Sequence, residues 1–192
     1  MSTGIFGGTF NPPHLGHERL VRRFADRLSL SKTLVIPTYE PPHKFAGKLA
    51  PAADRLRMCQ FMFGQDSRFE ISAMEIEREG KSYTVDTLTR LRETYPGERL
   101  YLIIGSDMLE SFHRWYRAED ILAMCTLCAA RREIRGESGD REQESGVIFD
   151  DMKPFEISST EIRELAAKGE DVRKWTGDAV ADYIRQRGLY LE

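Results

Sequence analysis

The chain has 192 residues, of which 41% are hydrophobic and 31% charged, and its formal net charge is −3. These values are typical of a globular protein, and the slight acidic excess argues against a broad nucleic-acid-binding face. No apolar run approaches the roughly 20 residues of a membrane span, and no basic segment precedes a signal core. Three cysteines without a secretion signal indicate a reducing, cytoplasmic environment. A chain of this length is expected to form one domain over residues 1–192.

Strand and helix patterns alternate along the chain. Short apolar runs bounded by turn residues predict buried strands, and apolar residues three and four positions apart predict helices. The expected strands cover 4–6, 32–37, 68–71, 99–104, 125–130 and 147–149. The expected helices cover 18–30, 52–63, 118–123 and 178–186, with others opening near 80–84, 105–107 and 157–163; the segment 73–77 is expected to be alternating and exposed. This order predicts an α/β fold with a parallel sheet flanked by helices and right-handed crossovers.

The opening stretch 4–17 carries the clearest chemical signal, Gly-Ile-Phe-Gly-Gly-Thr-Phe-Asn-Pro-Pro-His-Leu-Gly-His. An apolar run reaches Gly7 and Gly8, and after a turn His14 and His17 stand at the start of a helix. Glycines let backbone N–H groups approach a ligand, a helix start adds partial positive charge, and imidazoles donate hydrogen bonds. These features favour phosphate binding. The alternatives are a tight turn with two surface histidines, or half of a metal site.

Two further segments, 41–44 and 105–107, also follow predicted strands. Ligands of open parallel sheets bind outside the carboxyl ends of the strands, so both segments are expected to share one rim with the glycine turn. The helix start at 158–160 carries three hydroxyls with Arg163 one turn later, which fits either a simple N-cap or a polyphosphate seat. Trp115 and Tyr116 either pack in the core or stack on a flat ring.

Other apparent motifs are rejected. The stretch 80–82 reads Gly-Lys-Ser, but Glu75 stands where a P-loop needs its first glycine. Cys125 and Cys128 are three positions apart on a predicted strand, so they point to opposite faces and are interpreted as core cysteines. The charged stretch 131–146 is expected to be a mobile surface loop.

Five segments together resemble the bacterial nicotinate-nucleotide adenylyltransferases, members of the nucleotidyltransferase superfamily marked by His-x-Gly-His. They are 7–17, 41–44 (Pro-Pro-His-Lys), 82–88 (Ser-Tyr-Thr-Val-Asp-Thr-Leu), 104–107 (Ile-Gly-Ser-Asp) and 157–163 (Ile-Ser-Ser-Thr-Glu-Ile-Arg). The family often has Arg-Pro-Gly after the fifth strand, whereas this chain has Arg131-Arg132-Glu133, which leaves two candidates for a phosphate contact. The resemblance implies a single nucleotidyltransferase domain built on a Rossmann-like, doubly wound parallel sheet.

The resemblance implies transfer of AMP from ATP to nicotinate mononucleotide, giving nicotinate adenine dinucleotide and pyrophosphate in NAD biosynthesis. The implied catalytic residues are His14, His17, Lys44 and Arg163. The implied ATP-binding residues are Gly7, Gly8, Thr9, Phe10, His14, His17, Gly105, Asp107, Ser158, Thr160 and Arg163. The implied nicotinate mononucleotide-binding residues are Asn11, His43, Lys44, Tyr83, Thr84, Trp115 and Tyr116. Mg²⁺ would be carried by ATP or pyrophosphate, because the motifs offer no carboxylate cage. The expected partners are these small molecules, with neither nucleic acid nor membrane.

Three other functions are compatible with the histidine motif. A sister nucleotidyltransferase would use the same ATP site with pantetheine phosphate or another acceptor, and would differ around Tyr83, Thr84 and Trp115. A class I aminoacyl-tRNA synthetase core shares the motif, but this short acidic chain has no room for tRNA-binding domains. An ATP-sensing module would bind ATP without turnover. Pyrophosphate release from ATP with a panel of mononucleotides distinguishes these functions.

Overall fold

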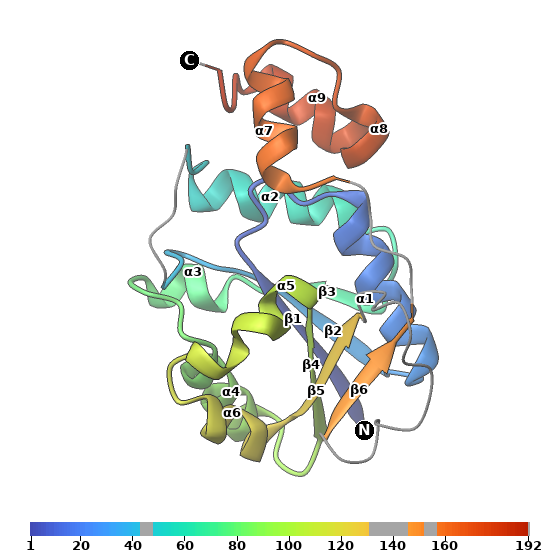
Figure 1. The fold of residues 1–192 in the computed structure, drawn as a ribbon, viewed down its shortest axis with the longest axis vertical. Coiled ribbons are helices and arrows are strands. Elements are labelled where there is room, and N and C mark those ends of the chain that lie inside the picture. The colour runs from blue at the N-terminus through green and yellow to red at the C-terminus, as the bar shows by residue number, and fades with distance from the viewer. Residues whose placement is uncertain (43–47, 131–145, 152–156, 192) are drawn as a thin grey trace.

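Six parallel strands form one sheet within the residues that the structure describes (Figure 1). The computed structural model describes residues 1–42, 48–130, 146–151 and 157–191. The strands are β1 (Ser2–Gly8), β2 (Lys32–Pro37), β3 (Phe69–Ile71), β4 (Arg99–Ile104), β5 (Thr126–Ala130) and β6 (Val147–Asp150). Their order across the sheet is β3-β2-β1-β4-β5-β6, and each neighbouring pair is parallel. This is the doubly wound, Rossmann-like arrangement that the sequence predicts.

Helices cover both faces of this sheet. They are α1 (Leu15–Arg27), α2 (Ala52–Phe63), α3 (Met74–Arg78), α4 (Thr84–Thr94), α5 (Ser106–Ser111), the 3₁₀ turn η1 (Phe112–Arg114), α6 (Ala118–Met124), α7 (Ser159–Ala167), α8 (Arg173–Thr176) and α9 (Asp178–Gln186). Successive strand side chains point to opposite faces, which creates two apolar cores. Phe6 and Ile103 pack with α1, α2 and the C-terminal helices, whereas Ile5 and Leu102 pack with α4 and α6.

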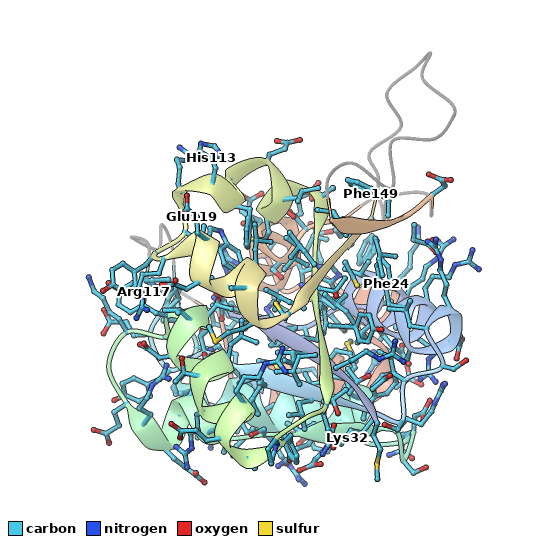
Figure 2. All side chains as sticks on the ribbon, turned by 90° about the horizontal axis from the view of Figure 1, so that it is seen from below. Phe24, Lys32, His113, Arg117, Glu119 and Phe149 are labelled. Carbon is cyan, nitrogen blue, oxygen red and sulfur yellow. The ribbon has the colours of Figure 1, made fainter. Side chains whose placement is uncertain are left out.

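The two cores contain the side chains that the apolar spacing selects. Phe24 of α1 is completely buried in the core that contains Phe6 and Ile103. On the opposite side of the molecule, His113, Arg117 and Glu119 are exposed and project outwards (Figure 2). Cys128 belongs to the first core and Cys125 to the second, so the prediction that these cysteines face opposite ways and pack is confirmed. No helix in the described ranges is long and apolar enough to cross a membrane.

Most predicted elements are confirmed, one is corrected, and one helix has no counterpart among the predictions. The prediction that 73–77 is an exposed alternating stretch is wrong, because Met74–Arg78 forms α3 and Glu75 is buried. The sequence pattern is misleading here because the buried residue, Glu75, is polar. Its carboxyl group accepts a hydrogen bond from the Thr87 hydroxyl of α4. The sequence does not predict α8, because four residues are too few to show helical spacing.

The sheet reverses its winding direction between β1 and β4. From β1 the order runs outward through β2 to β3 on one side and through β4 to β6 on the other. Such a switch point opens a crevice at the carboxyl ends of the two central strands. The turn after Gly8 and the turn after Ile104 therefore share one rim, as the sequence predicts.

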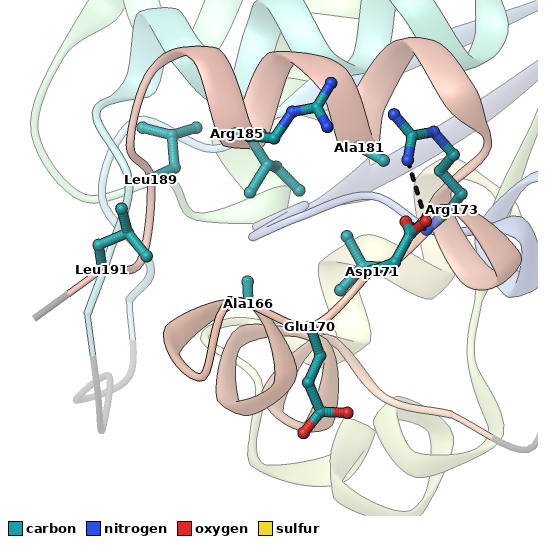
Figure 3. Close-up of a pocket in the computed structure, with 11 residues that line it drawn as sticks. Ala166, Glu170, Asp171, Arg173, Ala181, Arg185, Leu189 and Leu191 are labelled. Carbon is teal, nitrogen blue, oxygen red and sulfur yellow. Dashed lines mark hydrogen bonds and ion pairs between the residues drawn. The ribbon is translucent and has the colours of Figure 1, made fainter.

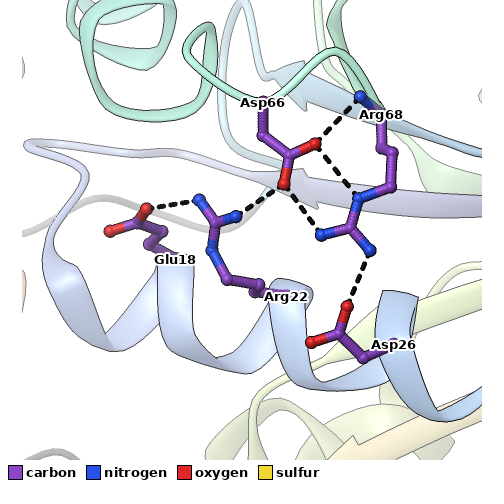
Figure 4. A network of polar contacts seen from close by, with 5 residues as sticks. All are labelled: Glu18, Arg22, Asp26, Asp66 and Arg68. Carbon is purple, nitrogen blue, oxygen red and sulfur yellow. Dashed lines mark hydrogen bonds and ion pairs between the residues drawn. The ribbon is translucent and has the colours of Figure 1, made fainter.

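A network of ion pairs holds α1 against the turn between α2 and β3 (Figure 4). Arg22 contacts Glu18 on its own helix over 2.8 Å and Asp66 over 2.5 Å. Arg68 joins Asp66 over 2.8 Å to Asp26 of α1 over 2.6 Å. Surface ion pairs contribute little singly and more as networks, so this one fixes the helix that begins at the two histidines.

Candidate functional site

The chain leaves β1 through a turn built around Phe10. Phe10 has a left-handed φ of 47°, and its buried ring packs edge-on against Phe6 at 5.3 Å and Phe63 at 6.1 Å. A side chain at Gly8 would place its Cβ 3.0 Å from that ring, so glycine is required for this close approach. The Phe10 side chain therefore supports the turn from inside. Its expected contact with ATP is available only through its backbone.

The two histidines stand together at the start of α1. His14 is the N-cap residue, and His17 lies in the first turn with its ring centroid 3.7 Å from that of His14. The backbone N–H of His14 donates to Nδ1 of His17 over 3.1 Å. The Phe10 ring meets His17 edge-on at 5.3 Å. The prediction that both histidines lie at the helix start is confirmed, and the core holds their rings in place.

Both imidazoles are neutral at physiological pH. Burial lowers the pKa of His14 to about 4. Burial, followed by the neighbouring His14, lowers the pKa of His17 well below its usual range. Neutral imidazole still donates one N–H, so the pair can bind a phosphate oxygen without carrying charge.

The start of α7 meets the same turn, although it is almost 150 residues further along the chain. Ser159 donates its hydroxyl to the carbonyl of Pro12 over 2.8 Å, and Arg163 donates to the carbonyl of Asn11 over 2.9 Å. Ser158 caps the helix in a reciprocal pair with Glu161. Two helix N-termini therefore converge at one place, where the helix dipoles and the N–H groups of the first turns favour an anion.

Thr160 and Arg163 complete this side of the site. The Arg163 guanidinium, half-buried, donates to the Thr160 hydroxyl oxygen over 3.1 Å. Thr160 itself is exposed, and its hydroxyl hydrogen can be donated to a ligand. The structure thus brings together the predicted residues of the first and last motifs.

On the β4 side, Gly105 is the N-cap of α5. A Cβ on Gly105 would lie 2.5 Å from a carboxylate oxygen of Asp107, so the glycine leaves room for that carboxylate to fold over the turn. Asp107 is exposed at the helix start. Both residues lie on the predicted rim.

The acceptor-side residues also come together. Tyr83 is the N-cap of α4, which begins at Thr84, and its ring lies 4.9 Å from that of Tyr116. Tyr116 is 58% exposed. Trp115 is half-buried and contacts Phe112 with ring centroids 5.2 Å apart. Trp115 thus takes part in packing, and its predicted stacking role stays a prediction.

Comparisons with known proteins decide the family. The cytidylyltransferase-like family model matches residues 5–165. A Geobacillus thermodenitrificans protein named "probable nicotinate-nucleotide adenylyltransferase" is 37% identical over 97% of this chain and 85% of its own length. An Oceanobacillus iheyensis protein of the same name is 38% identical over 97% of this chain and 95% of its own. The chain belongs to the nicotinate-nucleotide adenylyltransferase family.

A solved structure of this family has the same fold. The Plasmodium falciparum nicotinic acid mononucleotide adenylyltransferase complexed with NaAD aligns with a TM-score of 0.78, at 21% identity, over 98% of this chain and 97% of the other. At that identity the likeness establishes the fold alone. The Rossmann-like prediction is confirmed by it and by the strand order.

The side chain of Asn11, which the resemblance implies contacts nicotinate mononucleotide, is hydrogen-bonded within the protein. Asn11 is 2% exposed, and its side-chain oxygen accepts from the Ala50 N–H over 3.0 Å and from the Tyr190 hydroxyl over 2.9 Å. Its amide donates to the carbonyl of Lys48 over 2.9 Å. These contacts give Asn11 a structural role, joining the turn to the segment before α2 and to the C-terminus.

Several predicted positions fall outside the described residues. They are His43, Lys44, Arg131 and Arg132, together with nearly all of the stretch 131–146. The charged loop and the ambiguous phosphate-contacting arginine therefore stay predictions.

Sequence reasoning missed Arg55, which is completely buried on α2 directly behind the site. Its guanidinium donates to the carbonyl of Thr9, within the glycine-rich turn, over 2.8 Å. A signal existed in the sequence. Arg55 stands at the head of the helical apolar spacing formed with Met58, Cys59 and Met62, where a charged residue is unusual.

A hollow of about 190 Å³ lies elsewhere, between α7, α8 and α9 (Figure 3). Its apolar lining includes Ala166, Ala181 and Leu189, with the Arg173–Asp171 pair at its edge. None of the predicted site residues lines it. Small-molecule sites are commonly 300 Å³ or more, so this hollow is too small for a nucleotide.

Proposed function

We propose that this chain transfers AMP from ATP to the 5′-phosphate of nicotinate mononucleotide, giving nicotinate adenine dinucleotide and pyrophosphate. The observation that carries the proposal is the meeting of two helix starts around the paired histidines. Ser159 and Arg163 of α7 contact the backbone of Pro12 and Asn11, just before His14. Membership of the family and the names of its relatives support the same reaction.

The reaction makes modest chemical demands on the protein. An oxygen of the mononucleotide phosphate attacks the α-phosphorus of ATP, and the bond from that phosphorus to the bridging oxygen breaks as pyrophosphate leaves. The attacking phosphate is already ionised, so neither a strong base nor a covalent enzyme intermediate is needed. Catalysis therefore depends on in-line positioning and on stabilising charge at the transferring phosphoryl group.

We assign the phosphate-binding roles to groups already placed on one rim. His14 and His17 donate N–H bonds to the triphosphate, and Gly7, Gly8, Thr9 and the Phe10 backbone form its floor. Thr160 and Arg163 hold the β- and γ-phosphates at the start of α7; Ser158, the third residue that the resemblance implies there, donates both its N–H and its hydroxyl to Glu161 and would have to release one of them to bind phosphate. Gly105 and Asp107 lie along the nucleotide. The charge and dipoles of these groups, together with Mg²⁺, oppose the negative charge of the leaving pyrophosphate.

We further propose that Mg²⁺ enters with ATP as part of the substrate. Among the described residues, no three His, Cys, Asp or Glu side chains come close enough to hold a metal ion together. Mg²⁺ commonly binds through nucleotide phosphates and water with few protein ligands. Lys44 and His43 are assigned to the phosphate side by the resemblance alone.

For the acceptor, we propose that Tyr83, Thr84, Trp115 and Tyr116 surround the pyridine ring. The start of α4 at Thr84 leaves backbone N–H groups that suit the substrate carboxylate. The contact between Tyr83 and Tyr116 places the two predicted segments side by side. We propose one domain over 1–192 and a cytoplasmic location, which the three free, buried cysteines support.

The test is pyrophosphate release by the purified protein with ATP and Mg²⁺ and a panel of acceptors. The panel holds nicotinate mononucleotide, nicotinamide mononucleotide and pantetheine phosphate. We expect the highest kcat/KM with nicotinate mononucleotide. We also expect mass spectrometry to detect its adenylylated product. Faster turnover of pantetheine phosphate would show that nicotinate mononucleotide is not the acceptor. ATP binding without any turnover would support an ATP-sensing module instead.

A further inference from the structure

Arg55 joins three backbone segments that border the site. Its Nε donates to the carbonyl of Ala50 over 3.0 Å. One terminal nitrogen donates to the carbonyl of Thr9 over 2.8 Å, and the other to the carbonyl of Tyr39 over 2.8 Å. Ala50 precedes α2, Thr9 lies in the turn after β1, and Tyr39 follows β2. The planar fork of a guanidinium is suited to holding several acceptors at fixed angles.

This buried cation has no anionic partner within the described ranges. The adjacent carboxylate, Asp54, accepts instead from Tyr183 over 2.7 Å and from Arg187 over 3.2 Å. Burial lowers the pKa of Arg55, yet an arginine stays charged in proteins. A buried charge without an anionic partner is costly to the fold. A nearby bound anion would offset that cost.

The connection to such an anion is a single peptide group. The carbonyl of Thr9 and the N–H of Phe10 belong to the same peptide, and the guanidinium hydrogen bond on the carbonyl polarises that N–H into a stronger donor. The Phe10 side chain is fixed in the core, so the direction of this N–H is fixed as well. Polarised backbone donors in a glycine-rich turn are effective phosphate ligands.

We propose that Arg55 is a positioning residue for the triphosphate of ATP, acting through the Thr9–Phe10 peptide and supplying its uncompensated positive charge from behind the turn. This inference rests on the proposed function only in naming ATP as the anion. Arg55 does not touch the substrate and acts through the backbone of the ATP-binding turn. A substitution of Arg55 should therefore change ATP binding and the ATP dependence of the rate.

The experiment compares three variants of the full chain. Arg55→Lys keeps the charge but loses the fork, and Arg55→Met keeps most of the volume but loses both. Met58→Ala, one turn further along α2, is the control: Met58 is completely buried, so its truncation leaves a cavity in the core without removing any hydrogen bond of Arg55. All are assayed well below their own Tm, with ATP and nicotinate mononucleotide varied separately.

We expect kcat/KM for ATP to fall roughly tenfold in Arg55→Lys and a hundredfold or more in Arg55→Met, with KM for the mononucleotide changed less than about threefold. Met58→Ala should keep both KM values within about threefold at equal folded fraction. If Arg55→Met matches Met58→Ala in its ATP kinetics, Arg55 is structural only and the proposal is wrong.

A second measurement needs neither catalysis nor the Met variant. We expect ATP to shift the backbone amide resonance of Phe10 downfield in the unsubstituted chain, and that shift to shrink in Arg55→Lys. An undiminished shift in Arg55→Lys with an unchanged Kd for ATP overturns the proposal even if Arg55→Met does not fold. If the unsubstituted chain binds ATP but shows no turnover, the proposed function fails while this binding test of Arg55 still stands.

Discussion

The backbone N–H of His14 donates a hydrogen bond to Nδ1 of His17 over 3.1 Å. Because Nδ1 is then an acceptor, the single proton of the neutral His17 ring lies on Nε2. The start of α1 thereby selects the tautomer that offers Nε2–H as the donor. A phosphate oxygen needs a donor at this position.

This tautomer is directly observable. In ¹⁵N NMR spectra of the free chain at neutral pH, we expect Nε2 of His17 to be protonated and Nδ1 to be unprotonated. His14→Ala keeps the backbone N–H and should keep the tautomer. An Nδ1-protonated His17 would contradict the donor role assigned to Nε2.

Loss of either imidazole should slow the reaction strongly. We expect His14→Ala and His17→Ala each to lower kcat at least a hundredfold, about 2.7 kcal/mol of transition-state stabilisation. The matched control is His113→Ala, since His113 is exposed on η1. Steady-state kinetics at saturating ATP measure the effect, and circular dichroism checks the fold. Near-normal kcat in either variant would remove the histidines from the mechanism.

The buried histidine predicts a pH dependence of stability. The pKa of His14 is about 4 in the folded chain, against 6.5 when unperturbed. Between these values the unfolded chain binds the extra proton, so the free energy of unfolding falls as the pH drops from 6.5 towards 4 and is constant above 6.5. The loss is up to about 3 kcal/mol.

Urea denaturation of the ligand-free chain at a series of pH values measures this dependence. We expect His14→Gln, which cannot be protonated, to have a flatter slope over that range. An equal slope in both proteins would show that other groups cause the acid destabilisation.

Asn11 should matter chiefly for stability. Asn11→Ala leaves the Ala50 N–H, the Tyr190 hydroxyl and the Lys48 carbonyl without their partner, and we expect a cost of about 2–4 kcal/mol. Tyr190→Phe removes one of these bonds and should cost about 1 kcal/mol. Thermal denaturation measures both. A large rise in KM for the mononucleotide with unchanged Tm would instead restore the predicted substrate contact of Asn11.

The choice between acid and amide should depend on backbone donors. A carboxylate only accepts hydrogen bonds, whereas the amide of nicotinamide mononucleotide opposes one donor with its own NH₂. If N–H groups near Thr84 and Tyr116 face this group, the mismatch costs about 3–5 kcal/mol, or at least a hundredfold in kcat/KM.

Substitutions separate this effect from ring stacking. Thr84→Ala keeps the backbone and should leave the acid-to-amide ratio nearly unchanged, while Trp115→Ala should weaken both substrates together. Parallel kinetics with the two mononucleotides measure the ratios. Equal kcat/KM for acid and amide would show that the acceptor pocket is assigned wrongly.

The sequence by itself determined the order of strands and helices, the fold class and the rim on which the candidate site residues lie. The strand at 32–37 and the helices at 52–63 and 178–186 have the predicted bounds, because their apolar spacing and turn residues are local properties of the chain. The histidine pair at the start of α1 follows from the same local signals. The sequence does not predict the helix at 74–78, because its buried residue is polar.

Only the tertiary structure decided which side chains are used to support the turn after β1. Asn11 lies in the middle of the recognised motif, yet its side chain is used by residues 39 and 179 positions away. Arg55 lies in no recognised motif, yet it donates a hydrogen bond to a carbonyl of the glycine-rich turn 46 positions earlier. Spacing along the chain reports periodicity over a few turns, whereas such contacts depend on how separate elements pack against one another. That packing placed the start of α7 against the backbone of Pro12 and the guanidinium of Arg55 against the carbonyl of Thr9.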